Sequence, residues 1–134
     1  MSPEERLQQF MDAMKEWELK TFTLEPETEE FRAAAGAALQ AIFNTHLSAK
    51  GKDLKHWGTR LASGSASSPP QYDQELIKTE DGPKPSTVYA YTKHRTTPRK
   101  WWRYAIITGA DGDPRIDDLK STYVEGGEWG RGMY

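Results

Sequence analysis

The hydrophobic positions of this chain follow two different periods, a helical one in the first third and an alternating one in the second half. Residues 2–20 predict one helix. Its start combines a Ser2 cap, Pro3 at the first helical position and Glu5 three residues past the cap. The apolar stripe that follows at helical spacing is Leu7, Phe10, Met11, Met14 and Trp17.

A second helix is predicted after Pro26, because the acidic stretch at 27–30 suits a helix N-terminus and an alanine-rich run follows it. Its predicted buried face is Phe31, Ala35, Ala38, Leu39, Ile42 and Phe43, with Leu47 near the end. The short link between the two helices predicts a helical hairpin.

The second half of the chain alternates between apolar and polar positions and predicts four strands, at residues 75–79, 87–93, 100–108 and 115–124. The third is the strongest signal and is interpreted as the central strand. Its two faces are Trp102, Tyr104 and Ile106 on one side, and Trp101, Arg103, Ala105 and Ile107 on the other. Both faces of this strand carry large side chains. One face is expected to lie under the helices, and the other is expected to be covered by another part of the chain, to line a pocket or to bind a partner. Helices followed by antiparallel strands predict an α+β fold.

Composition narrows the class of protein. The 134 residues, 36% of them hydrophobic, fit a single domain over 1–134, with a loop-rich insertion at 48–73 and a C-terminal tail at 125–134. A net charge of −2, from 18 Lys and Arg against 20 Asp and Glu, argues against a nucleic-acid partner. The polar N-terminus and the lack of a long apolar run predict a cytoplasmic protein with no membrane partner.

Candidate chemistry is sparse. The chain has no cysteine, and His46, His56 and His94 lack metal-ligand spacing, so neither a metal nor a cofactor is expected. The candidates for acid–base work are Asp117, Asp118, Tyr89, Tyr104 and His94. Surface charges and core aromatics explain these residues better, so no catalytic residue is assigned.

Cations and aromatic rings are interleaved between residues 93 and 103. Three interpretations of this patch stay open. It stacks on nucleic-acid bases, it binds a protein partner, or it is a charged hairpin tip beside a buried strand with no binding role. Two interpretations of Trp129 in the tail stay open: its side chain packs back onto the core, or it contacts a partner.

Several stretches together resemble immunity proteins of bacterial polymorphic toxin systems that have the nuclear transport factor two-like fold. They run in order along nearly the whole chain: residues 10–14 with Trp17-Glu18, Ile42-Phe43, residues 69–73, Arg103-Tyr104, Asp111-Gly112 with residues 115–117, and residues 126–129. One position departs from the pattern. Pro114 replaces a Trp expected before Arg115, and because proline cannot donate to a sheet ladder, the start of the last strand and any pocket there are left open.

The resemblance implies a cone-shaped α+β domain, in which an N-terminal helical hairpin packs on a strongly curved antiparallel sheet. It also implies a non-catalytic immunity protein that neutralises a cognate toxin domain of a secreted effector in the producing cell. From composition and strand position, the expected partner-binding residues are Tyr91, Lys93, Arg95, Trp102, Arg103, Asp117, Glu128 and Trp129.

Two other functions stay open at this point. One is a small-molecule binder or ketosteroid isomerase-like enzyme that uses the cone interior, with Asp117 or Asp118 and Tyr104 as acid and base. This reading requires a carboxylate that points into an enclosed apolar pocket. The other is a homodimeric scaffold module.

Overall fold

The computed structural model describes residues 1–21, 28–52, 70–96, 100–122 and 130–131. Their helices are α1 (Pro3–Thr21), α2 (Glu29–His46) and α3 (Ala49–Lys52). Their strands are β1 (Gln74–Asp81), β2 (Thr87–His94), β3 (Trp101–Thr108), β4 (Pro114–Thr122) and β5 (Gly130–Arg131). Two of these elements, α3 and β5, were not predicted from the sequence.

The predicted start of α1 is confirmed by a reciprocal pair of hydrogen bonds. The Glu5 N–H donates to Ser2 Oγ at 3.1 Å, and the Ser2 amino group donates to Glu5 Oε1 at 3.0 Å. Helix α2 has a comparable cap that the sequence reading missed, since the Phe31 N–H donates to Thr28 Oγ1 at 3.0 Å.

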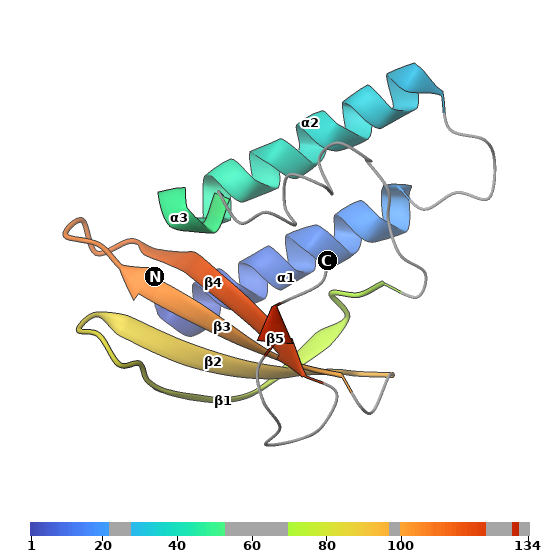
Figure 1. The fold of residues 1–134 in the computed structure, drawn as a ribbon. Helices are drawn as coiled ribbons and strands as arrows, with labels where there is room; N and C mark the ends of the chain where they lie inside the picture. The colour runs from blue at the N-terminus through green and yellow to red at the C-terminus, as the bar shows by residue number, and fades with distance from the viewer. Residues whose placement is uncertain (22–27, 53–69, 97–99, 123–129, 132–134) are drawn as a thin grey trace.

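The strands form one antiparallel sheet in chain order, β1-β2-β3-β4-β5, with β3 at its centre. Both long helices lie on the same side of this sheet: α1 runs along it and α2 packs over α1 (Figure 1). The predicted α+β order, with helices on one face, is confirmed. Pro114 does not disturb β4. It is the first residue of that strand, opposite Thr108, a position where a strand tolerates proline.

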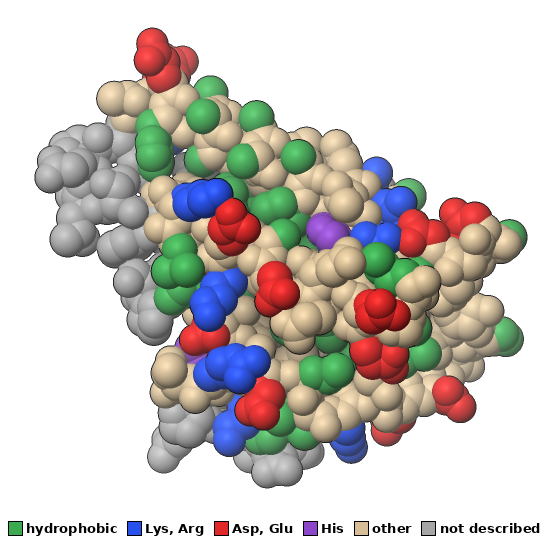
Figure 2. Space-filling view, turned by 180° about the vertical axis from the view of Figure 1, so that it is seen from behind, with side chains coloured by type: hydrophobic (Ala, Val, Ile, Leu, Met, Phe, Trp, Pro, Cys, Tyr) green, Lys and Arg blue, Asp and Glu red, His purple; other side chains and the backbone are tan. Residues whose placement is uncertain are grey.

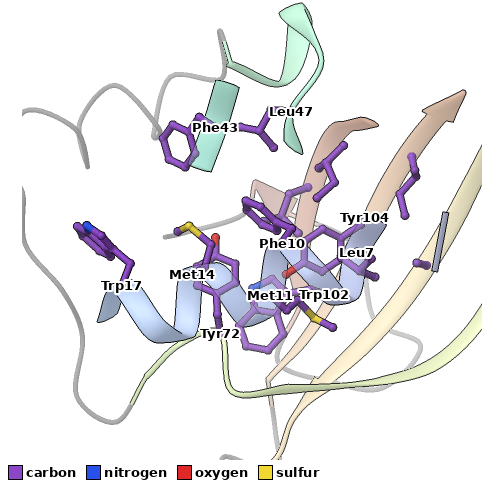
Figure 3. Close-up of a cluster of buried hydrophobic side chains, with 14 of the residues drawn as sticks. Leu7, Phe10, Met11, Met14, Trp17, Phe43, Leu47, Tyr72, Trp102 and Tyr104 are labelled. Carbon is purple, nitrogen blue, oxygen red and sulfur yellow. The ribbon is translucent and has the colours of Figure 1, made fainter. Parts of the chain in front are cut away.

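The core fills the space between α1 and the sheet (Figure 3). Trp102, Tyr104 and Ile106 are each 0% exposed, so the predicted apolar face of the central strand is the one under the helices. Phe10 of α1 meets the Tyr104 ring edge-on, with the ring centroids 6.4 Å apart. Phe10 also meets the His46 ring of α2 edge-on, with the ring centroids 6.0 Å apart, so rings from α1, α2 and β3 pack together around Phe10.

The predicted buried face of α2 needs one correction. Ala35, Leu39 and Phe43 are buried as expected, but Ala38 is exposed. Helix α2 contacts α1 along a narrow stripe, fixed in part by the Trp17 Nε1–H, which donates to the Ala35 carbonyl at 2.9 Å. Ala38 lies beside this stripe and faces solvent, because α2 covers another helix rather than a sheet.

Candidate partner-binding face

The side of the sheet away from the helices is a continuous exposed surface of alternating aromatic and charged residues. Its central members are Tyr89, Tyr91, Lys93, Trp101, Arg103 and Lys120, and we call it the outer sheet face. Register sets their neighbours: Tyr91 lies opposite Arg103, and Lys93 lies opposite Trp101. All six side chains are partly exposed, in contrast to the buried residues that alternate with them.

Cations lie over the rings of this face. Arg103 Cζ lies 4.4 Å from the centre of the Tyr89 ring, and Lys93 Nζ lies 5.5 Å from the Trp101 ring. Lys78 Nζ of β1 lies 4.8 Å from the Tyr91 ring. These contacts hold long side chains that are otherwise free to rotate, so the face is partly ordered before any partner arrives.

The Tyr91 hydroxyl is held as a donor. It hydrogen-bonds to the carboxylate of Glu80 on the neighbouring strand. Partial burial, followed by this bond and the charge of Glu80, raises the pKa of Tyr91, while Arg103 acts in the opposite direction. The hydroxyl therefore stays protonated at neutral pH.

A β-bulge places two carboxylates at the β4 margin of the outer sheet face. Ala105 pairs with Asp118, but the next residue, Ile106, pairs with Ile116, so Asp117 is the extra residue. Because Ile116 and Leu119 are both buried, Asp117 and Asp118 between them both lie on the outer side.

Asp117 and Asp118 already have partners within the chain. The Ser48 hydroxyl donates to Asp117 Oδ1 at 2.7 Å, and Lys50 Nζ lies 3.6 Å from the other carboxylate oxygen. Asp118 Oδ1 accepts the Leu119 N–H at 2.8 Å. Beside them is an open hollow of about 330 Å³ with Tyr89 and Ala105 among its lining residues.

The acid–base pair considered for an enzyme is not brought together. Tyr104 lies inside the core, where its hydroxyl donates to Gln74 Oε1 at 2.8 Å and burial strongly raises the pKa of the phenol. Asp117 and Asp118 lie on the opposite side of the sheet. The carboxylates thus do not point into the interior that the isomerase-like mechanism requires.

A second hollow, of about 510 Å³, lies between α1 and α2 and is lined mainly by alanine and aromatic side chains. The charged residues on its wall are Glu16 and Lys20, and they form an ion pair with each other at 2.6 Å. On the side of the molecule opposite to the view in Figure 1, hydrophobic side chains lie along α2, and cationic and anionic side chains alternate below that helix (Figure 2).

One buried carboxylate escaped the sequence analysis. Glu18 of α1 is 0% exposed, and its two oxygens accept the N–H groups of Gln71 and Tyr72 at 2.8 and 2.9 Å. These bonds fasten the segment before β1 to α1, so we interpret Glu18 as structural. In the part of the chain that the structure describes, no three His, Asp or Glu side chains are grouped to hold a metal ion.

The predicted partner-binding residues separate into four groups, of which the last is Trp102 alone in the core. Tyr91, Lys93 and Arg103 meet on the outer sheet face, with Asp117 at its margin. Arg95 lies just beyond β2, where its Nε is 3.5 Å from Asp73 Oδ1. Glu128 and Trp129 lie outside the described residues.

Trp102 requires a correction, because it is 0% exposed and belongs to the core rather than to a surface. Its neighbour Trp101 is the tryptophan on the outer sheet face. The sequence analysis did not count Tyr89, Lys78 or Lys120 among the partner-binding residues. Strand alternation was the signal for Tyr89, once it is known which face of β3 the helices cover. Alternation alone places Lys78 and Lys120 on the core side, because the register of β1 and of β4 shifts before them.

The structure is an α+β domain whose outer sheet face carries cations and aromatic rings. The chain matches the model of the NTF2 fold immunity protein family over residues 2–132 and belongs to that family. Comparison with curated proteins and with solved structures found no match. Among the described residues, no helix is long and apolar enough to cross a membrane.

Proposed function

We propose that this protein binds a cognate toxin domain of a secreted effector and neutralises it in the producing cell, without catalysis of its own. Membership of the immunity family supports a role in a toxin system. The observation that carries the proposal further is the outer sheet face, where aromatic and Arg side chains are exposed and held in place. Such residues dominate the binding energy of protein interfaces.

The proposed toxin-binding residues are those that the outer sheet face presents together. Tyr91, Lys93 and Arg103 are at its centre, with Tyr89 and Trp101 as further contacts. Asp117 and Arg95 are proposed as contacts at its margins, and Glu128 and Trp129 as contacts from the tail. An interface of the usual size buries about 1,200 to 2,000 Å² in total, which a sheet face of this kind accommodates.

The proposed action is steric. A rigid sheet face laid over the active site or the substrate path of the toxin excludes the substrate without any chemical step. The positions of Tyr104, Asp117 and Asp118 support a non-catalytic role, because they leave the interior without the acid–base pair considered above.

Co-expression tests this proposal. The toxin domain encoded by the neighbouring gene is expressed in cells with the wild-type protein or with the double variant Tyr91→Ala, Arg103→Ala. We expect the wild type to restore growth and the double variant to protect much less. Leu19→Ala is the control, since Leu19 is 61% exposed on α1, away from the outer sheet face. Continued killing in the presence of equal amounts of wild-type protein contradicts the proposed function.

A further inference from the structure

Three cations and a tyrosine form a row across the outer sheet face. Lys78 of β1 pairs with Tyr91 of β2, which pairs with Arg103 of β3, which pairs with Lys120 of β4. Neighbouring strands lie about 5 Å apart, so this cation row extends over roughly 15 Å. It crosses the four longer strands of the sheet at right angles to their direction.

The cation row places two like charges side by side. Arg103 and Lys120 occupy directly opposite positions, where like charges destabilise a sheet. Lys120 Nζ lies 3.8 Å from Asp118 Oδ2, too far for a strong ion pair. Lys78, Arg103 and Lys120 lie in one row although the whole chain has a net charge of −2. An arrangement that costs stability in the free protein is typical of a functional surface.

We propose that the cation row binds carboxylate side chains on an acidic surface of the toxin domain, an inference that rests on the proposed function. The rings beneath the cations support it. Lys78 lies over Tyr91 and Arg103 lies over Tyr89, so both head groups lose less freedom when they bind a partner. The Arg103 guanidinium also offers paired donors that match a carboxylate.

The surroundings of the cation row disfavour two other occupants. A second copy of the chain, docked about a two-fold axis that passes through the row, places the row against itself and opposes like charges. A nucleic acid presents a continuous line of phosphates, and the row is flanked by carboxylates: Glu75 opposite Lys93 on one side, and Glu80 and Asp118 on the other. Discrete carboxylates of a folded partner avoid both conflicts.

Charge reversal tests the cation row. The dissociation constant for the toxin domain of the neighbouring gene is measured with wild-type protein, Arg103→Glu and Lys120→Glu, each at low and at physiological ionic strength. We expect each reversal to weaken binding at least about tenfold and to reduce its salt dependence. The control is Arg32→Glu, which makes the same change in net charge at an exposed position of α2 and is expected to leave the dissociation constant unchanged.

A measurement on the free protein separates lost binding from lost folding. Lys120→Glu converts a like-charge pair with Arg103 into an opposite-charge pair, so we expect its melting temperature to equal or exceed that of the wild type. If both reversals bind as tightly as Arg32→Glu while the wild type still protects cells, the cation row is not the recognition site and the proposed function stands. If the wild type forms a dimer that Arg103→Glu dissociates, the occupant is a second copy and the inference is wrong. If the wild type neither binds the toxin nor protects cells, both proposals fall.

Discussion

At the scale of single residues, the tightest constraint is a buried arginine that joins three parts of the chain. Arg6 of α1 is 6% exposed. Its Nε donates to the Pro114 carbonyl at 2.8 Å, and one terminal nitrogen donates to Asp113 Oδ1 at 2.6 Å. The other terminal nitrogen donates to the Thr45 carbonyl at 3.2 Å and lies 3.0 Å from His46 Nδ1. Arg6 therefore fixes the end of α2 and the β3–β4 turn against the start of α1.

This cluster predicts a loss of stability in mild acid. Burial, and then the charges of Arg6 and Arg115, lower the pKa of His46 to about 4, with Asp113 acting in the opposite direction. In the unfolded chain, histidine titrates near pH 6.5. Between these two pH values the unfolded chain binds a proton at His46 and the folded protein does not. The free energy of unfolding therefore has its full value above about pH 6.5. Below that pH it declines, by up to about 3 kcal/mol.

The check is the free energy of unfolding in denaturant, measured from about pH 7 to about pH 5. His46→Gln keeps an acceptor for Arg6 but removes the titrating group, so we expect a flatter pH dependence than in the wild type. Parallel curves for the two proteins would exclude His46 as the source.

At the scale of elements, local patterns were predictable and long-range pairing was not. The Ser2 cap and the apolar side of β3 follow from neighbours a few residues away, and both are confirmed. Elements α3 and β5 were missed because they are short, and β5 depends on pairing with β4. Sequence offers little signal for elements that tertiary contacts impose.

The bulge at Asp117 shows how one missed detail alters the interpretation of a site. Strict alternation along β4 places Asp118 on the same side as Ile116, in the core and within reach of Tyr104. Strand alternation alone does not decide which side of the sheet either aspartate faces, so the sequence left the acid–base hypothesis open. The extra residue turns Asp118 to the outer side, and no pattern in this chain's sequence marks its position.

Two adjacent tryptophans offer a matched test of the two faces of β3. Trp102 is 0% exposed, so Trp102→Ala is expected to lower the free energy of unfolding by about 3 to 5 kcal/mol. Trp101 lies on the outer sheet face, so Trp101→Ala is expected to cost much less stability, about 1 kcal/mol or below, and to weaken toxin binding. Denaturant unfolding and a binding titration measure the two effects. Equal destabilisation by the two variants would contradict this assignment of the faces.

At the scale of the whole molecule, the two sides of the sheet differ in burial and in the kind of residue they carry. The side under α1 and α2 supplies the core that holds the fold together. The outer sheet face contributes little to that core and is partly exposed. The stability of the fold therefore places few constraints on which residues occupy it. The structure thus separates a core side of the sheet from a partly exposed side of cations and aromatic rings.

The division predicts how binding changes global stability. We expect the free protein to unfold in one cooperative transition, as a single domain does, and the toxin domain to raise the melting temperature because it binds only the folded state. At a toxin concentration about 100 times the dissociation constant, the gain is about 2.7 kcal/mol, or roughly 10 °C for a chain of this size. Calorimetry measures both quantities, with Arg103→Glu expected to melt as a single transition but to gain much less from the toxin. Two separate transitions in the free protein would contradict a single domain, whereas an unchanged melting temperature with saturating toxin would show that the folded state does not bind it.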